Sequence, residues 1–159
     1  DPLYLTWKMR GLGLQTRFIE LADAVNSNMP HYVVSRVQDA LNDVGKPLSG
    51  ARVLILGVTY KKDVADLRES PALTIIEELR LRHADVTYND PYVPSLSPDS
   101  QVTLRSVELS QALLGWADCV IIHTAHSIYD WAWVGQHARL VFDTRGVISV
   151  SDCSHLVRL

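Results

Sequence analysis

Charged side chains crowd residues 57–71, between an apolar run and a Ser-Pro pair that signals the start of a helix. Lys61 and Lys62 come shortly after the apolar run, and Tyr60 adds an aromatic ring with a hydroxyl. Ammonium groups beside the free N–H groups of a helix N-terminus attract phosphate. In a parallel α/β sheet, such a strand-to-helix connection lies where ligands bind. The stretch therefore predicts an anion-binding loop.

The same residue types also allow a purely structural interpretation. The two lysines would then be a solvated pair, and Asp66, Arg68 and Glu69 would form a salt-bridge network that braces the loop. Exposed ion pairs contribute little to stability, typically about 0–1 kcal/mol. The crowding of three cations and three carboxylates into one short loop favours binding, but leaves the structural alternative open.

Polar residues end three further apolar runs. Asp90 ends one run, His123 and His126 follow a second, and Arg145 follows a third. Because the carboxyl ends of parallel strands share one edge of the sheet, we expect Arg145 to offer a bidentate fork to the same phosphate. Two histidines without a third ligand nearby are weak evidence for a metal, so we expect no metal site. His126 is expected to be structural, or at most a polar contact at this edge.

The motifs of cofactor binding and nucleophilic catalysis are missing from these runs. A dinucleotide-binding domain carries Gly-x-Gly-x-x-Gly after its first strand, whereas here Gly57 is followed by Val, Thr and Tyr. A pyrophosphate could not approach this backbone as closely, so we expect no NAD binding by this part of the chain. No combination of Ser, His and Asp has a nucleophile-elbow context. The residues alone thus predict a binding domain for a phosphorylated ligand.

The elements that must position these residues alternate between strand and helix. The expected strands lie at residues 52–58, 85–89, 102–104, 118–123, 139–143 and 155–159, and the expected helices at residues 71–82, 106–116 and 128–136. A proline-rich irregular loop is expected at residues 91–98. This alternation predicts a Rossmann-like α/β fold, in which a doubly wound and mainly parallel sheet carries helices on both faces.

A long amphipathic pattern precedes the sheet. Apolar residues recur at steps of three and four across residues 16–43, which predicts a helix about 40 Å long. Pro30 interrupts the pattern, so we expect a kink or two helices that meet near Asn28. The helix either packs on its own domain or connects domains and dimerises. A break follows at residues 45–50, so we expect two domains, residues 1–46 and 47–159.

Composition narrows the class of protein. Of the 159 residues, 47% are apolar and 21% charged, which is ordinary for a globular protein. A net charge of −3 gives no general attraction to nucleic acid or membranes, and no apolar run is long enough to span a bilayer. Cys119 and Cys153 show no metal-ligand spacing, so we expect a reduced, cytoplasmic protein. The start at Asp1, without a methionine or a signal pattern, indicates a piece of a longer protein.

Residues 57–71, with Asn-Asp-Pro-Tyr-Val-Pro at 89–94, resemble the C-terminal domain of the UDP-glucose/GDP-mannose dehydrogenase family. Residues 1–8, 17–22, 25–26 and 29–30 are similar to its bacterial branch that acts on UDP-N-acetylhexosamines, and the resemblance covers essentially the whole chain. Family members oxidise the C6 hydroxyl of a nucleotide sugar in two NAD-dependent hydride transfers, through a thiohemiacetal and a thioester on a cysteine. An N-terminal domain binds NAD, a long central helix dimerises, and a C-terminal domain holds the UDP moiety.

The resemblance also implies roles for individual residues. Asp1 matches an aspartate that lies four residues after the nucleophilic cysteine and assists the water chemistry. Tyr60 and Lys61 match a pair that contacts the UDP-sugar. Arg145 matches an arginine at the substrate or subunit edge. Three further matches are expected to brace the loop or a subunit contact: Asp66, Arg68 and Glu69.

The implied function is that of the central helix and UDP-binding domain of an NAD-dependent nucleotide-sugar 6-dehydrogenase in surface polysaccharide synthesis. The expected substrate is UDP-N-acetylglucosamine, with UDP-glucose and UDP-N-acetylmannosamine as alternatives, and the expected assembly is a homo-oligomer through the central helix. We expect the chain alone to lack dehydrogenase activity, because the matching cysteine would precede residue 1. The alternative from another class is a stand-alone nucleotide-binding or regulatory module, such as a receiver-like phosphoacceptor that uses Asp90.

Overall fold

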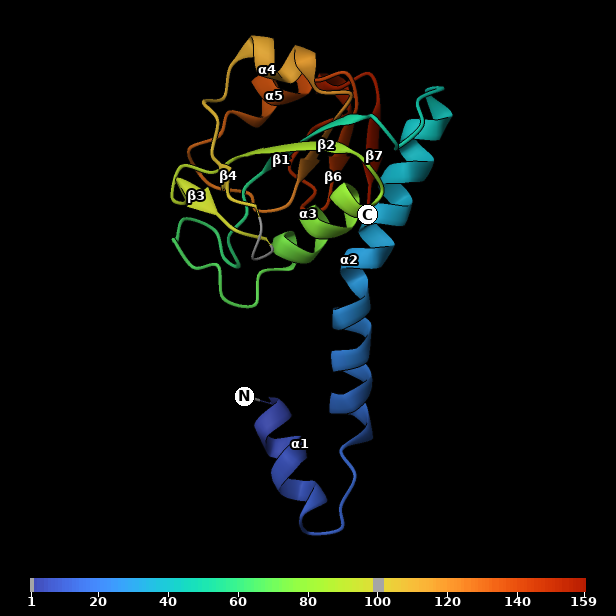
Figure 1. Ribbon diagram of the computed structural model, residues 1–159, viewed down its shortest axis with the longest axis vertical. Helices are drawn as coiled ribbons and strands as arrows, with labels where there is room; N and C mark the ends of the chain where they lie inside the picture. The colour runs from blue at the N-terminus through green and yellow to red at the C-terminus, as the bar shows by residue number, and fades with distance from the viewer. Residues whose placement is uncertain (1, 99–101) are drawn as a thin grey trace.

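The computed structural model describes residues 2–98 and 102–159 (Figure 1). The helices are α1 (Pro2–Arg10), α2 (Arg17–Asp43), α3 (Pro71–Leu81), α4 (Gln111–Trp116) and α5 (Trp131–His137), with a 3-10 turn at Val150–Asp152. The strands are β1 (Arg52–Leu56), β2 (Asp85–Asn89), β3 (Ser95–Leu96), β4 (Leu104–Arg105), β5 (Cys119–Ile122), β6 (Val141–Asp143) and β7 (Leu156–Arg158). A five-stranded sheet has the order β2-β1-β5-β6-β7, and all its pairs are parallel. The predicted α/β class is confirmed.

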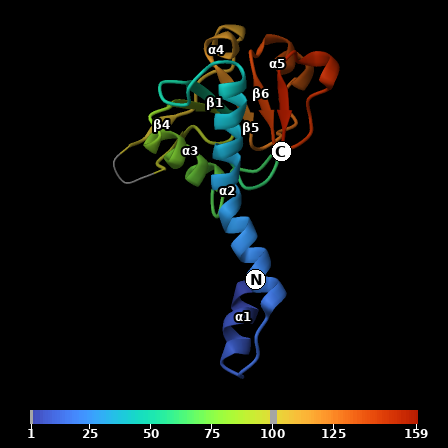
Figure 2. The ribbon, with the colours of Figure 1, turned by 90° about the vertical axis from the view of Figure 1, so that its right-hand side faces the viewer.

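The sheet is buried on both faces, which makes its strands read as continuous apolar runs. Successive residues of a strand point to opposite faces. Val53 and Ile55 therefore pack with α2 and α3, whereas Leu54 and Leu56 pack with α4 and α5. Figure 2 shows α2 crossing in front of the sheet. This doubly wound arrangement is the one that the alternation of elements predicts.

α2 is one continuous helix of 27 residues, with Pro30 inside it. The alternative of two helices that meet near Asn28 is therefore wrong. A proline inside a helix costs about 3 kcal/mol, because a hydrogen bond is lost and the ring crowds the preceding turn. The C-terminal half of α2 offsets this cost by burying Val33, Val37 and Leu41 in the core.

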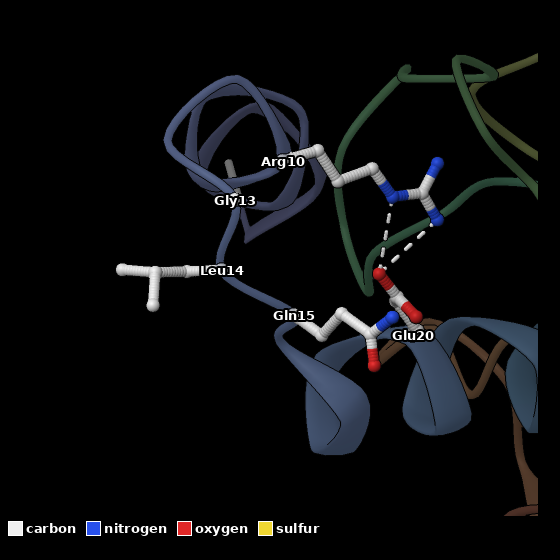
Figure 3. Close-up of a pocket in the computed structure, with 5 residues that line it drawn as sticks. All are labelled: Arg10, Gly13, Leu14, Gln15 and Glu20. Carbon is white, nitrogen blue, oxygen red and sulfur yellow. Dashed lines mark hydrogen bonds and ion pairs between the residues drawn. The ribbon is translucent and has the colours of Figure 1, made fainter.

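The N-terminal half of α2 extends away from the sheet and contacts α1 (Figures 1 and 2). No element is predicted for residues 1–15, yet Pro2 occupies the first helical position of α1, and Gly13 has a left-handed φ of 73° just beyond its end. Arg10 Nε and Nη2 donate to Glu20 Oε1 at 3.2 and 3.1 Å, beside a hollow of about 380 Å³ (Figure 3). This pair ties the end of α1 to the start of α2.

The shorter helices differ from the prediction at their N-termini. α4 and α5 begin later than expected, because side-chain caps lie at Ser110 and Asp130. The residues before these caps, 106–110 and 128–130, stay outside the helices. The segment predicted as an irregular proline-rich loop contributes β3, which pairs with β4 in an antiparallel ribbon.

A largely buried carboxylate anchors the start of the sheet. Asp118, directly before β5, accepts hydrogen bonds from Arg52 N at 2.9 Å and Arg52 Nη2 at 2.8 Å, and Lys46 Nζ lies 3.1 Å away. Its side chain is only 8% exposed. The hydrogen bond from the Arg52 side chain holds the pKa of Asp118 well below its usual value. The cluster links the segment after α2 to the first residues of β1 and β5.

We expect Asp118→Asn to lower the free energy of unfolding by about 1–3 kcal/mol, because charge-assisted hydrogen bonds are lost. A lowered folded-state pKa stabilises the protein above the unfolded pKa of about 3.9, and this stabilisation is lost as the pH falls toward the folded value. In urea titrations, the difference from wild type should therefore be constant near pH 7 and shrink below about pH 4.

Asp85→Asn is the matched control, because Asp85 is exposed and acts on the same arginine through its charge alone. Its effect should stay within about 0.5 kcal/mol. Equal losses in the two variants would contradict an anchoring role for Asp118.

Candidate functional site

The loops that follow β1, β2, β5 and β6 meet at the edge where these parallel strands end, here called the carboxyl edge. Tyr60, Asp90, His123 and Arg145 all lie in these loops, as the sequence predicts. Adjacent strands are about 4.8 Å apart, and β5 lies between β1 and β6. The ends of β1 and β6 are therefore about 10 Å apart.

Gly57 ends β1 because the loop after β5 passes directly against its backbone. Its φ is 73°, and a Cβ added there would lie 2.2 Å from the carbonyl oxygen of Thr124. Thr124 N donates to the carbonyl oxygen of Leu56 at 3.2 Å, which holds the two strand ends together. The glycine thus serves close packing between strand ends. A dinucleotide phosphate cannot occupy the space that Thr124 fills.

The Asp90 carboxylate is the centre of a buried polar network. Oδ2 accepts a hydrogen bond from Val58 N at 2.7 Å and lies 3.0 Å from His126 Nε2. Oδ1 accepts from Tyr92 N at 2.8 Å. The side chains of Asp90 and His126 are both 0% exposed. Since both oxygens are occupied and shielded from solvent, Asp90 is unsuited to the phosphoacceptor role of a receiver-like module.

Tyr60 and Lys61 combine exposed side chains with a fixed backbone. Tyr60 is 48% exposed, and Lys61 Nζ lies 5.7 Å from the centre of its ring, within the range of a cation–π contact. Tyr60 N donates to the carbonyl oxygen of Asp66 at 2.8 Å, and Thr59 Oγ1 donates to the carbonyl oxygen of Lys61 at 2.8 Å. The pair is therefore held in place and open to a ligand.

The loop that carries this pair is closed at its base by Ser70. Ser70 Oγ donates to the carbonyl oxygen of Val58 at 2.7 Å and accepts from Ala72 N at 3.3 Å. The first bond joins the two ends of the loop, and the second caps α3 with Pro71 at its first position. The Ser-Pro helix start predicted from the sequence is confirmed.

The three residues expected to brace the loop divide into two groups. Arg68 Nε and Nη2 donate to Asp66 Oδ1 and Oδ2 at 3.0 and 2.9 Å. These bonds lower the pKa of Asp66 to about 2. Glu69 has a left-handed φ of 59° and lines a hollow of about 470 Å³ with residues of α1 and α2. The ion pair thus lies within the loop, whereas Glu69 faces the long helix.

Arg145 is anchored toward the end of β5. Its Nε donates to the carbonyl oxygen of His123 at 2.6 Å, and its backbone N donates to Asp143 Oδ1 at 2.9 Å. Burial, with the charge of Arg145 nearby, lowers the pKa of His123 to about 4. His123 is therefore neutral near pH 7, and the guanidinium is the cationic group of this pair.

Other sequence-based candidates contribute less to this edge. Asp1 lies outside the described residues. Among residues 2–98 and 102–159, no group of His, Cys, Asp and Glu could hold a metal ion, and no helix is long and apolar enough to cross a membrane. Cys119 and Cys153 are free and buried, and burial raises the pKa of Cys119 to about 12, which makes it an inert thiol.

Sequence reasoning missed two features of the site. The contact between Gly57 and Thr124 joins residues far apart in the chain, and only the lone glycine after an apolar run hinted at a close approach. The network of Asp90 was also missed, although an Asp-Pro pair at a strand end is a turn signal. The Asp90 carboxylate accepts a hydrogen bond from Val58 N and contacts His126, and these partners lie in the loops after β1 and β5.

Residues 54–150 match the UDP-binding domain of the UDP-glucose/GDP-mannose dehydrogenase family. The match begins in β1 and includes every loop of the carboxyl edge. The chain belongs to this family. Strands β1 to β6 fall in the family's UDP-binding domain, whereas α1 and the whole of α2 precede the matched region and β7 follows it.

Relatives align beyond the matched region. Protein CapL of Staphylococcus aureus is 30% identical over 164 residues, which cover 100% of this chain and 38% of CapL. The UDP-N-acetyl-D-glucosamine 6-dehydrogenase of Pseudomonas aeruginosa is 32% identical over 127 residues, 80% of this chain and 30% of that enzyme. A UDP-glucose dehydrogenase structure from Pyrobaculum islandicum superposes with a TM-score of 0.77 and 28% identity, over 98% of this chain and 35% of that one. This chain therefore spans about a third of the length of these proteins.

Gly57→Ala should lower the free energy of unfolding by more than about 3 kcal/mol, because the added Cβ meets the Thr124 backbone and φ is left-handed. Gly146→Ala is the matched control: its φ is also left-handed, at 68°, but a Cβ there meets nothing within 4 Å. It should cost only about 1–2 kcal/mol. Urea titration measures both, and similar losses would contradict the close approach as the reason for Gly57.

Proposed function

We propose that this chain supplies the UDP-binding part of an NAD-dependent nucleotide-sugar 6-dehydrogenase. In this proposal residues 47–159 hold the UDP moiety, and residues 1–46 connect it to the remainder of the enzyme. The observation that carries the proposal is the pair Tyr60 and Lys61, which is exposed on a hydrogen-bonded loop within the region that matches the family's UDP-binding domain.

The side chains suit a nucleoside diphosphate. The ammonium of Lys61 would neutralise a phosphate oxygen, and Tyr60 would stack on a ring or donate its hydroxyl. Arg145, from the loop after β6, would reach the second phosphate with its planar fork. These groups bind and orient the substrate. Asp1, at the other end of the chain, is proposed to have a catalytic role in the water chemistry.

The carboxyl edge does not fit the dinucleotide cofactor. A pyrophosphate needs free backbone N–H groups after the first strand. Here Val58 N is bonded to Asp90, and the Thr124 backbone fills the open side of Gly57. NAD is therefore proposed to bind to the remainder of the enzyme, where it accepts the hydride.

UDP-N-acetylglucosamine is the proposed substrate, on the strength of the P. aeruginosa relative's name and of the resemblance in residues 1–8, 17–22, 25–26 and 29–30. UDP-glucose and UDP-N-acetylmannosamine are the alternatives. The P. islandicum structure is that of a UDP-glucose dehydrogenase. The groups at the carboxyl edge address the uridine diphosphate that all three substrates share.

The long helix is the proposed oligomer interface. Four large apolar side chains of α1 and α2 are exposed: Trp7 (70%), Phe18 (89%), Leu21 (62%) and Val25 (52%). Phe18, Leu21 and Val25 recur at steps of three and four along α2, and exposed apolar side chains on one helical face are typical of a protein–protein interface. We propose that a second copy of the chain covers it.

UDP titrated into the chain by calorimetry should bind, and Lys61→Ala should weaken the affinity about ten- to hundredfold, since a charge-assisted contact is worth about 1.5–3 kcal/mol. The weakening should diminish in high salt. Lys62→Ala is the control, because it removes the same charge from the next residue and should change the affinity less than about threefold. An equal loss in both variants would indicate general attraction of the anion and contradict a specific contact with Lys61.

Phe18→Glu with Leu21→Glu should shift the chain toward monomer in analytical ultracentrifugation, because the charges would be buried in the proposed interface. Leu81→Glu is the matched control: Leu81 is 72% exposed but lies at the end of α3. It should leave the assembly unchanged. A wild-type chain that is monomeric at all concentrations tested would refute the interface.

A further inference from the structure

Two loops of the carboxyl edge hold each other through reciprocal hydrogen bonds. The 57–70 loop carries Tyr60 and Lys61, and the 123–130 loop follows β5. Asp63 N of the first loop donates to His126 Nδ1 of the second at 2.9 Å. In return, Ser127 N and Oγ donate to Asp63 Oδ1 and Oδ2, both at 2.7 Å. This clamp joins segments that are more than 60 residues apart in the chain.

The clamp requires one particular tautomer of His126. Its Nδ1 accepts a hydrogen bond from a backbone N–H and therefore carries no proton. The ring proton of the neutral side chain is then on Nε2, which donates to Asp90 Oδ2 at 3.0 Å. Because the ring is 0% exposed, water cannot replace either partner. Asp90 thus selects the tautomer that presents an acceptor to the 57–70 loop.

The same hydrogen bonds support a left-handed backbone at Asp63. Its φ is 60°, in a region that costs most L-residues about 1–2 kcal/mol but that Asp enters more readily through local hydrogen bonds of its side chain. The hydrogen bonds from Ser127 lower the pKa of Asp63, so its carboxylate stays charged and anchored. Asp63 lies two residues after Lys61. Its conformation therefore sets the direction in which the chain leaves the proposed ligand contact.

We propose that His126 is a positioning residue for the UDP site. By accepting the Asp63 N–H, it locks the 57–70 loop against the 123–130 loop and holds Tyr60 and Lys61 at the carboxyl edge. The ring touches no substrate itself. This inference rests on the proposed function, because it assigns His126 to the binding of the same ligand.

Two substitutions separate the clamp from the contact with Asp90. In His126→Asn, the amide oxygen takes the place of Nδ1 and can still accept the Asp63 N–H, but the donor to Asp90 is lost. In His126→Gln, the amide nitrogen reaches the place of Nε2 and can still donate to Asp90, but the acceptor for Asp63 is lost. His137→Gln is the control for the removal of an imidazole, since His137 bonds to Trp133 within α5.

The readouts are hydrogen exchange of the Asp63 amide by NMR and UDP affinity by calorimetry. One hydrogen bond is worth about 0.5–1.5 kcal/mol, or about two- to tenfold. His126→Gln should speed exchange at Asp63 and weaken UDP binding by that factor. His126→Asn should stay within about twofold of wild type in both, although it unfolds at lower urea. In wild type, the imidazole ¹⁵N shifts should show a proton on Nε2 and none on Nδ1.

A merely structural role would make both variants lose affinity in proportion to their loss of stability, and that result would overturn the proposal. Unchanged exchange at Asp63 in His126→Gln, or a proton on Nδ1, would also overturn it. A wild-type chain that fails to bind UDP would refute the proposed function and the binding role of His126 together. In that case the exchange and ¹⁵N data still decide whether the clamp exists. UDP binding that depends on Lys61 but not on His126 refutes the positioning role of His126 alone and leaves the proposed function standing.

Discussion

The carboxyl edge depends on one buried carboxylate, that of Asp90. Its two oxygens accept the backbone N–H groups of Val58 and Tyr92, and Oδ2 also contacts His126, so the loops after β1 and β5 both meet the loop that carries Asp90. A buried charge is stable only when hydrogen bonds replace its hydration. This requirement fixes the positions of the loops around Asp90 relative to one another. The need to hydrogen-bond the buried Asp90 carboxylate therefore fixes the geometry of the loops that carry the exposed side chains of the site.

Polar anchors at both ends of the sheet complement its apolar middle. The apolar side chains of β1 are fully buried at Val53, Leu54, Ile55 and Leu56. Their burial favours a compact core, but it does not determine which loops contact one another. Hydrogen bonds are directional, and the clusters around Asp118 and Asp90 supply that specification. At the end of the sheet where the strands begin, Asp118 joins β1 and β5 to the segment after α2. At the carboxyl edge the partners are loops, and side chains such as Tyr60 stay exposed on them.

The sequence was most informative where local physics decides the structure. Strand β1 and helix α3 are marked by an apolar run and by the Ser70 cap, and both occur where the pattern places them. The charged loop between them was placed correctly as well, because it only needs to follow a strand. Long-range contacts were not readable: the Asp118 cluster, the Gly57–Thr124 approach and the His126 clamp join residues that no local pattern relates. Helix α1 was missed because its apolar residues stay exposed and leave no amphipathic signature.

Because α2 is continuous through Pro30, the buried face of its C-terminal half and the exposed apolar face of its N-terminal half have a fixed orientation around the helix axis. Its C-terminal half is locked in the core by Val33 and Val37, while Phe18 and Val25 protrude from the same rigid rod. Each residue of an α-helix turns the rod by about 100° and advances it by 1.5 Å. A single insertion between the two halves would swing the protruding apolar face by more than a quarter turn while leaving the sheet intact. The number of residues between the two halves of α2 therefore fixes the direction in which its exposed apolar face points relative to the loops of the carboxyl edge.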